Sequence, residues 1–176
     1  GSHCSLLLNN LLYVFGGRNE RGELLDSSEI WNGENWMQGP KTKSKREGAS
    51  AIELRHRIYV IGGSENELLS TGEVFEGDQW HMLDYELPEP LSAVGLVAIS
   101  RTRILIIGGF CRDGLSKNIY ELRVTSGKCR LVGTLQRGDI FKSNGYLQKN
   151  QILLLGSLGV HSIKEDYTSK FRPYKQ

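Results

Sequence analysis

Short apolar runs alternate with polar turns along the whole chain, and four of these runs end in a pair of small residues. The runs cover residues 11–15, 57–61, 103–107 and 151–155, and the pairs that follow are Gly16-Gly17, Gly62-Gly63, Gly108-Gly109 and Gly156-Ser157. The first residues of successive pairs are 46, 46 and 48 positions apart. A fixed period of this size indicates a repeat architecture.

Each repeat contains four short segments that are typical of strands. An extended run precedes the glycine strand, and connections such as Asn9-Asn10 and Arg55-His56 predict a tight hairpin between the two. The glycine strand is apolar almost without alternation, so we expect both of its faces to be covered. Third strands are predicted at 28–31, 72–75 and 118–122, and fourth strands begin at Trp36, Trp80 and Cys129.

This pattern predicts an all-β propeller, because an antiparallel sheet of four strands in each repeat of this length is a propeller blade. No segment has helical periodicity. We expect one domain over residues 1–176, with blades at about 3–40, 46–86, 92–135 and 138–176, and we interpret Gly1-Ser2 as a tag remnant. Three assemblies remain open: a compact ring of four blades, two arcs that pair into a larger ring, and a piece of a longer protein.

The glycine pairs are interpreted as part of the scaffold. Glycine lets the backbone bend at the end of the strand while an aromatic side chain of the same blade packs over it. Binding of a phosphate would require a following helix, and none is predicted. Glu29, Glu73 and Glu121 recur at similar positions in the third strands, which indicates a structural role repeated in each blade.

Composition and charge exclude several classes of protein. The chain has 176 residues, 22 of them Lys or Arg and 20 Asp or Glu, and a net charge of +2 does not indicate a nucleic-acid-binding protein. Its apolar runs are too short to span a membrane, and no signal peptide is visible, so a cytoplasmic location is favoured.

Residues that could carry chemistry are few. The four histidines, His3, His56, His81 and His161, show no metal-like spacing, and no catalytic group or cofactor site is predicted, so a role other than catalysis is favoured. The cysteines Cys4, Cys111 and Cys129 are interpreted as small buried apolar residues. For Cys111 an alternative is a reactive thiol, since the neighbouring Arg112 would lower its pKa.

The repeats resemble the Kelch repeat, in which an apolar strand ends in Gly-Gly and is followed by an aromatic residue and then a tryptophan. The first two repeats match through Trp31 with Trp36 and through Phe75 with Trp80. The third places Cys129 where the tryptophan belongs, and the fourth is degenerate, with Tyr167 and Phe171 as the candidate aromatic positions. The resemblance covers the whole chain and implies a Kelch-type β-propeller, but the fold hosts many unrelated functions.

A binding surface is expected where the loops after the glycine pairs emerge on one face, at residues 18–21, 64–67, 110–113 and 158–161. Arginines there suit carboxylates, and an exposed aromatic residue could anchor a partner. The candidate partner-binding residues are Arg18, Asn19, Arg21, Arg46, Ser64, Asn66, Ser92, Phe110 and Arg112.

The resemblance adds that Arg18 and Arg46 match arginines that line an acidic-peptide pocket in some BTB-Kelch adaptors. The other repeats lack these arginines, and Arg46 could instead bind carbonyl groups of a neighbouring blade. The function that follows is a protein-interaction module with a protein or peptide partner, an acidic one being a candidate, and a homodimer as a further option. The alternative is a small-molecule-binding, carbohydrate-binding or enzymatic propeller with its site at the channel mouth.

Overall fold

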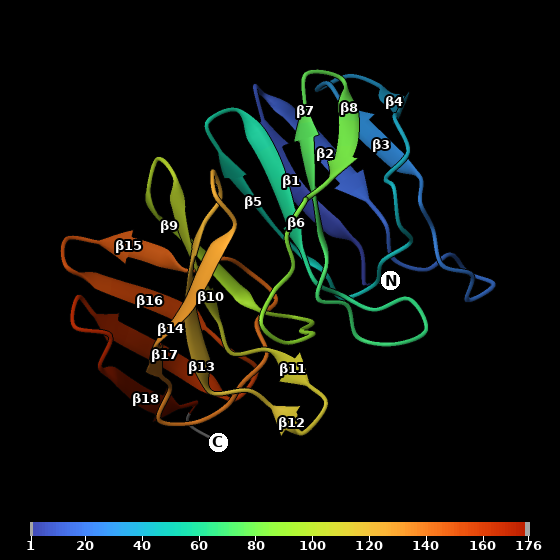
Figure 1. Cartoon of the computed structure of the whole chain (residues 1–176). Helices are drawn as coiled ribbons and strands as arrows, with labels where there is room; N and C mark the ends of the chain where they lie inside the picture. Colours follow the sequence, from blue (N-terminus) through green and yellow to red (C-terminus); the bar gives the residue numbers. More distant parts are fainter. Residues whose placement is uncertain (1, 175–176) are drawn as a thin grey trace. The chain divides into compact units, whose positions relative to one another are not determined.

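The computed structural model describes residues 2–174, and within this range every regular element is a β-strand. Gly1 of the expected tag remnant and the last two residues of the fourth expected blade lie outside the described residues. The chain divides into two compact units, residues 1–92 and 93–176. Each unit contains two antiparallel sheets of four strands, which confirms the expected blade composition (Figure 1).

The first unit contains blades 1 and 2, in each of which neighbouring strands follow one another along the chain. Blade 1 consists of β1 (Cys4–Leu8), β2 (Leu11–Phe15), β3 (Ser28–Trp31) and β4 (Trp36–Gly39). Blade 2 consists of β5 (Ser50–Leu54), β6 (Arg57–Ile61), β7 (Gly72–Glu76) and β8 (Gln79–Met82).

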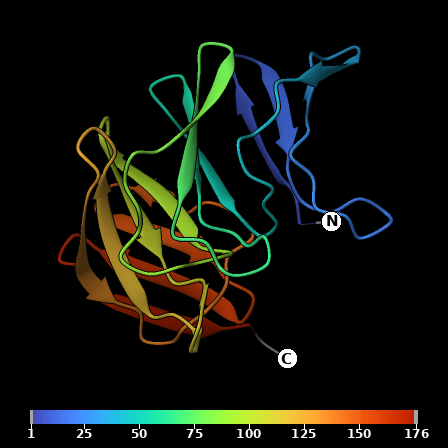
Figure 2. The ribbon, with the colours of Figure 1, turned by 45° about the vertical axis from the view of Figure 1, so that its right-hand side comes forward.

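The second unit contains blades 3 and 4 and a small additional hairpin. Blade 3 consists of β9 (Gly95–Ser100), β10 (Arg103–Ile107), β13 (Asn118–Arg123) and β14 (Lys128–Thr134), and the hairpin of β11 (Phe110–Cys111) and β12 (Gly114–Leu115). Blade 4 consists of β15 (Tyr146–Gln148), β16 (Gln151–Leu155), β17 (Gly159–Lys164) and β18 (Ser169–Pro173). Figure 2 shows this sheet, in orange to red, beside that of blade 3.

Two-residue turns join the first two strands of blades 1 and 2, as the sequence predicts. Asn9 and Asn10 have φ angles of 51° and 63°, and Arg55 and His56 have 56° and 60°. Positive φ at both central residues defines the type I′ turn, whose twist matches that of the strands it joins. These turns fix the register of the glycine strand in each blade.

The blades of each unit pack face to face. In the blade 1–2 interface, Tyr13 and Phe15 of β2 share a buried cluster with Ile58 and Val60 of β6 and with Phe75 and Trp80. In the blade 3–4 interface, the buried hydrophobic residues are aliphatic apart from Phe141: Val97, Leu105, Ile107, Ile119, Leu135, Phe141, Ile152, Leu154 and Ile163.

Four details differ from the expectation. Glu121 pairs with Leu105, whereas Glu29 and Glu73 pair with Val14 and Val60, so Glu121 points to the other side of its sheet and does not share their position. Residues 158–161, expected as a loop, belong largely to β17, because only a tight turn separates Gly156 from Gly159. Residues 110–115 form the β11–β12 hairpin rather than an open loop. Tyr167 lies between β17 and β18, so it does not occupy the third-strand aromatic position of the repeat.

Candidate partner-binding site

The glycine pairs join each blade to the linker that follows it. Gly16 and Gly17 have φ angles of 66° and 81°, a region that favours glycine, and a Cβ on Gly16 would lie 2.7 Å from the carbonyl oxygen of Arg46. The scaffold interpretation therefore fits, but a linker carbonyl and not an aromatic ring approaches this glycine. The second glycine donates its N–H to that carbonyl in three blades: Gly17 to Arg46 (2.7 Å), Gly63 to Leu91 (2.8 Å) and Gly109 to Asp139 (2.8 Å).

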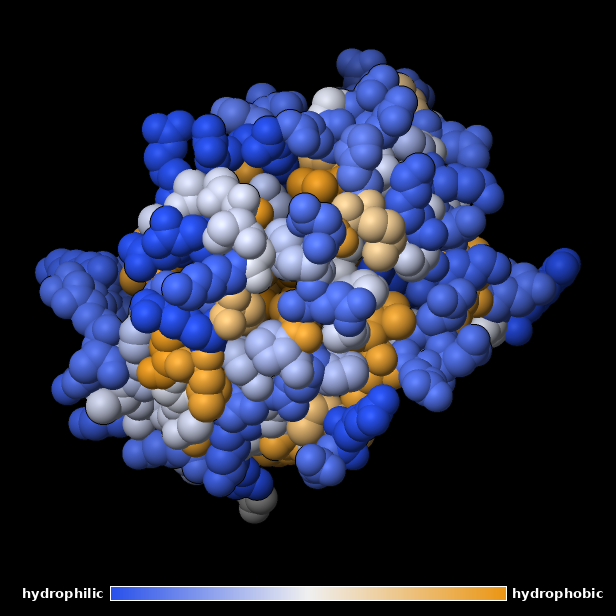
Figure 3. All heavy atoms as spheres, in the orientation of Figure 1, coloured by the Kyte–Doolittle hydropathy of each residue, from blue (hydrophilic) through white to orange (hydrophobic). Residues whose placement is uncertain are grey.

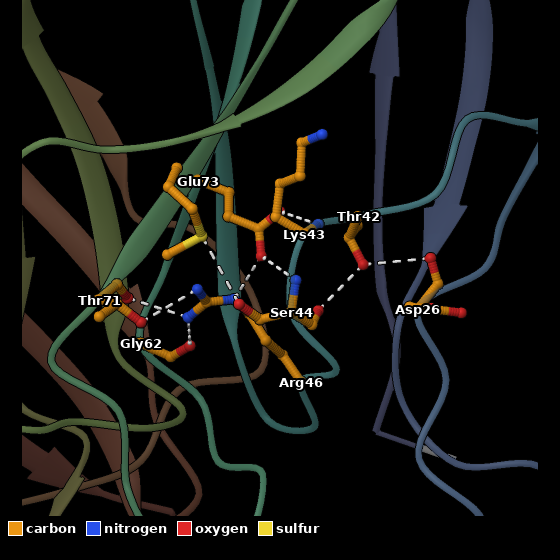
Figure 4. A network of polar contacts seen from close by, with 9 residues as sticks. Asp26, Thr42, Lys43, Ser44, Arg46, Gly62, Thr71 and Glu73 are labelled. Atoms are coloured by element: carbon orange, nitrogen blue, oxygen red, sulfur yellow. Dashed lines mark hydrogen bonds and ion pairs between the residues drawn. The ribbon is translucent and has the colours of Figure 1, made fainter.

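Arg46 lies inside the first unit, with only 4% of the residue exposed (Figure 4). Its Nε donates to Glu73 Oε1 at 3.0 Å, and Nη1 donates to the carbonyls of Gly62 and Thr71 at 2.9 and 3.0 Å. The Glu73 carboxylate also accepts the backbone N–H groups of Lys43 and Ser44. Every part of this pair has a partner, so Arg46 holds the linker against blade 2 and does not face a ligand. This is the alternative that the sequence left open.

Arg18 lies at the surface, where it binds Glu47. Its Nε and Nη2 donate to the two oxygens of Glu47 at 2.7 and 2.6 Å, and Nη1 donates to the carbonyl of Gly22 at 2.6 Å. The hydrogen bonds from Arg18 lower the pKa of Glu47 and the same bonds raise the pKa of Arg18. An acidic ligand would therefore compete with Glu47, a residue that the sequence analysis did not select.

Glu47 also connects Arg18 to the loop of blade 2. Its backbone pairs with Ser64 through two hydrogen bonds, of 3.0 and 2.9 Å. The loops after the first two glycine pairs are therefore neighbours at one end of the first unit. The loop of blade 1 exposes Arg18 and Arg21, and the loop of blade 2 exposes Glu65, Asn66 and Glu67.

Two further candidates of this unit have mainly structural contacts. Asn19 is partly buried, and its Oδ1 accepts the N–H groups of Arg21 and Glu23, which shapes the loop. Ser92 is partly buried and its Cβ lies near Gly48.

In the second unit, Phe110 and Arg112 lie on the β11–β12 hairpin. Phe110 is 47% exposed and pairs across the hairpin with Leu115, which is 44% exposed. Arg112 is exposed, whereas Cys111 between them is buried. Phe110 is thus available as an apolar anchor, and Cys111 has the buried position expected of a structural cysteine.

A buried pair in blade 4 was not found from the sequence. Asp139 and His161 are both fully buried, and His161 Nε2 lies 2.9 Å from Asp139 Oδ2. Asp139 occupies the same place in its linker as Arg46 does, since the carbonyl of each accepts the N–H of the preceding glycine pair. His161 occupies the same place in its strand as Glu73 does, because His161 pairs with Leu154 as Glu73 pairs with Val60. Blades 2 and 4 therefore place a pair of an acidic and a basic side chain at the same two positions. In blade 2 the linker carries the base and the strand the acid, and in blade 4 the linker carries the acid and the strand the base.

Other candidate chemistry is limited within residues 2–174. Burial raises the pKa of Cys4 to about 12 and that of Cys129 to about 11, which keeps both thiols protonated at neutral pH. No group of three or more His, Cys, Asp or Glu is placed there to hold a metal ion. None of the described segments is a helix of the length and apolarity needed to cross a membrane.

Comparisons with known proteins define the class. No family model matches the sequence. A solved structure of YjhT superposes with a TM-score of 0.82 at 11% identity, covering 99% of this chain and 66% of that chain. This similarity shows the fold: the chain has the propeller fold of four-stranded blades.

The sequence relatives give the family. Kelch-like protein 41b of Danio rerio is 30% identical over 129 residues, which cover 70% of this chain and 21% of the relative. An F-box/kelch-repeat protein of Arabidopsis thaliana is 25% identical over 128 residues, covering 61% and 27%, and Kelch-like protein 8 of Mus musculus is 32% identical over 69 residues, covering 38% and 11%. The chain belongs to the Kelch-repeat propeller family, and it spans about a fifth to a quarter of the length of the two relatives with the longest matches.

Proposed function

We propose that this chain is a protein-interaction module that binds a protein or peptide partner through the loops after its glycine pairs. The observation that carries the proposal is the continuous surface from Arg18 through Glu47 to Ser64, which links the loops of two blades. Kelch-repeat relatives support an interaction role for the class.

The charges of this surface define the partner further. The loop of blade 1 offers the cations Arg18 and Arg21, and the loop of blade 2 offers Glu65 and Glu67. A complementary partner presents acidic residues to the first loop and basic residues beside them, because opposite charges across an interface favour encounter and fix the register. This proposal keeps the acidic segment of the partner but removes Arg46 from the contact surface.

A peptide-display selection tests this proposal. Random peptides are selected on the immobilised chain, and the enriched peptides are measured by biolayer interferometry against the double variant Arg18→Glu, Arg21→Glu. We expect enriched peptides to carry acidic residues and to bind the variant at least about 10-fold more weakly, as for interface hot spots. The affinity should also fall with added salt, because these charges are exposed.

The control is Arg57→Ala, which removes a partly exposed arginine that pairs with Glu76. Arg57 lies at the start of β6, the opposite end of that strand from the glycine pair. This variant should bind as the wild type does. Equal binding of the enriched peptides by the wild type and the Arg18→Glu, Arg21→Glu variant would exclude this surface as the site.

We also propose that the chain associates with itself, in line with the homodimer considered from its sequence. This association involves the outer sheet faces of blades 1 and 4 and not the loops after the glycine pairs.

A further inference from the structure

Blade 1 has an apolar face on the side opposite to the blade 1–2 interface. Side chains alternate across a strand, so the residues between those that contact blade 2 point to the other side. On β1 to β4 these are the polar residues Ser5 and Gln38 and a mainly apolar group that pairs across the sheet: Leu7, Leu12, Val14, Glu29, Trp31 and Trp36. Leu7 is 68% exposed and Trp36 is 53% exposed. Figure 3 shows, on the side of the molecule turned to the viewer, apolar residues at the surface among polar ones.

This face has the side chains that blade 2 uses to pack on blade 1. Trp31 pairs with Leu12 and Trp36, as Phe75 pairs with Ile58 and Trp80. In blade 2, Phe75 and Trp80 are only 4% and 1% exposed. Their rings lie against Tyr13 at 5.4 Å and Phe15 at 4.9 Å. The Trp31–Trp36 pair, with ring centroids 5.4 Å apart, is therefore equivalent to the Phe75–Trp80 pair, but Trp36 is exposed where Trp80 is buried against the next blade.

Blade 4 carries the complementary half of this contact. Leu153 and Leu155 lie three positions and one position before Gly156, as Tyr13 and Phe15 lie before Gly16. They alternate with Ile152 and Leu154, which face blade 3, so they point to the outer side. Leu153 is 37% exposed and Leu155 is 58% exposed. Tyr146, which pairs with Leu153 across the sheet, is 71% exposed.

The charges of the two faces are opposite. Glu29 is exposed on the outer face of blade 1. It holds the position in blade 1 that Glu73 holds in blade 2, where Glu73 binds Arg46. On the described strands of blade 4, the charged residues at outer-face positions are the cations Lys164, Lys170 and Arg172, which pair with Gln151, Ser162 and Val160 of that face. The acidic residues Glu165 and Asp166 lie in the turn between β17 and β18. A carboxylate on one apolar face thus has cations available on the other.

We propose that the outer face of blade 4 in one copy of the chain packs on the outer face of blade 1 in a second copy. The contact reproduces between two molecules the packing that joins blade 1 to blade 2: Leu153 and Leu155 cover Trp31 and Trp36, and a cation of β18 meets Glu29. Apolar residues gathered on an exposed sheet face, such as Leu7 with Trp36, are typical of interaction sites. The inference is independent of the loops, so that either proposal can fail without the other.

This contact is heterologous, because the two copies use different faces. The wild type should associate as its concentration rises, to twice its mass of 19.8 kDa or above. A blade 4 variant, Tyr146→Asp with Leu155→Asp, and a blade 1 variant, Leu7→Asp with Trp36→Asp, should each be monomeric. All four positions are exposed, so the substitutions leave the interior of the blades unchanged. The control Leu131→Asp, at a residue 56% exposed on β14, should associate as the wild type does.

Mixing the two variants is the decisive measurement. Each variant keeps the face that the other has lost, so an equimolar mixture should form a 1:1 dimer and nothing larger by sedimentation velocity. A wild type that is monomeric up to about 100 µM, far above the Kd of specific interfaces of standard size, would overturn the proposal. So would a blade 4 variant that keeps the wild-type mass alone, since blade 1 would then pair with itself.

Cross-linking provides a test that does not depend on disruptive substitutions. Trp36→Cys in one tagged copy and Leu155→Cys in a differently tagged copy should be joined by a short bismaleimide reagent. The same reaction with Leu131→Cys in place of Leu155→Cys should give little product. Equal yields from both pairs would contradict the assigned faces.

Discussion

The two interfaces between blades differ in how completely they are filled. In the blade 1–2 interface, three aromatic contacts fill the space, and the cavity beside Phe15 and Arg46 is about 10 Å³, room for one water at most. At the edge of the blade 3–4 interface, a pocket of about 200 Å³ that is partly open to solvent remains, lined by apolar residues such as Leu105 and Ile163 and by charged ones such as Lys164.

The difference follows from single positions of the repeat. Where blade 2 has Phe75 paired with Trp80, blade 4 has Ile163 paired with Ser169, and both replacements are smaller. Where blade 1 has Ile30 paired with Tyr13, blade 3 has Glu121 paired with Leu105, and Glu121 binds Arg103, Arg130 and the hydroxyl of Tyr167. The strands thus pair in the same way in both units. In the blade 3–4 interface, smaller side chains, the polar contacts of Glu121 and a pocket replace the aromatic contacts that Phe75 and Trp80 make in the blade 1–2 interface.

Breaking the buried ion pair of the blade 1–2 interface should have the largest effect. Arg46→Ala leaves the Glu73 carboxylate buried without its cation, which should lower the free energy of unfolding by about 3–5 kcal/mol. The double variant Arg46→Met, Glu73→Leu should be less destabilised than Arg46→Ala, because no charge stays buried, although the N–H groups of Lys43 and Ser44 lose their acceptor. Urea denaturation followed by circular dichroism measures both.

The exposed pair of Arg57 and Glu76 is the control for this comparison, and Arg57→Ala should cost less than about 1 kcal/mol. If Arg57→Ala and Arg46→Ala were equally destabilising, the buried pair would have no special role in holding the linker.

Acid should affect the second unit through Asp139. Burial alone would raise the pKa of this carboxyl, but hydrogen bonds from Ser157, His161 and the backbone outweigh burial and lower the pKa. Because the folded pKa is the lower one, the stabilisation is complete above the unfolded value of about 3.9 and is lost as the pH falls through the folded value.

Asp139→Asn should therefore be less stable than the wild type at pH 6 and should lose less stability than the wild type between pH 5 and pH 3. Thermal unfolding over this range, monitored in both proteins, measures the difference. Parallel pH profiles for the two proteins would show that Asp139 makes no contribution to the acid response.

Filling the cavity should have the smallest effect and the opposite sign. Ile163→Phe places a larger side chain at the position that Phe75 holds in blade 2, and it should raise the free energy of unfolding by about 1 kcal/mol. In the filled interface, Val60→Phe should instead destabilise by about 1–3 kcal/mol through overpacking. Denaturation midpoints that move in the same direction for both variants would contradict the difference in packing.

Much of the fold could be predicted from the sequence because the repeat signal is local. The glycine pairs, the apolar strands that precede them and the turns at Asn9-Asn10 and Arg55-His56 all act within a few residues of one another. The place of Cys129 at the Trp80 position was also predicted, and the pairing of Cys129 with Leu122 agrees with it. The degenerate fourth repeat was harder, since only Ser157 and Leu158 separate its glycine from β17 and Tyr167 lies outside the strands.

The candidate site was less predictable, because its contacts join residues distant in sequence. Arg18 and Glu47 are 29 positions apart, and so no local pattern connects them. The same holds for Asp139 and His161, which are 22 positions apart. One signal was available in the sequence Arg46-Glu47. Neighbouring side chains point to opposite sides of an extended linker, so one of the two had to point inward, as Arg46 does, and the other outward, as Glu47 does.

The bond from the second glycine of a pair to the linker carbonyl has a consequence for engineering. A deletion made at the end of a fourth strand would leave the amide of Gly17, Gly63 or Gly109 without its acceptor, since that acceptor lies in the segment leading to the following sheet. A segment that is duplicated, removed or transplanted without this loss must therefore end after the linker carbonyl of Arg46, Leu91 or Asp139, and not at the last strand of the sheet.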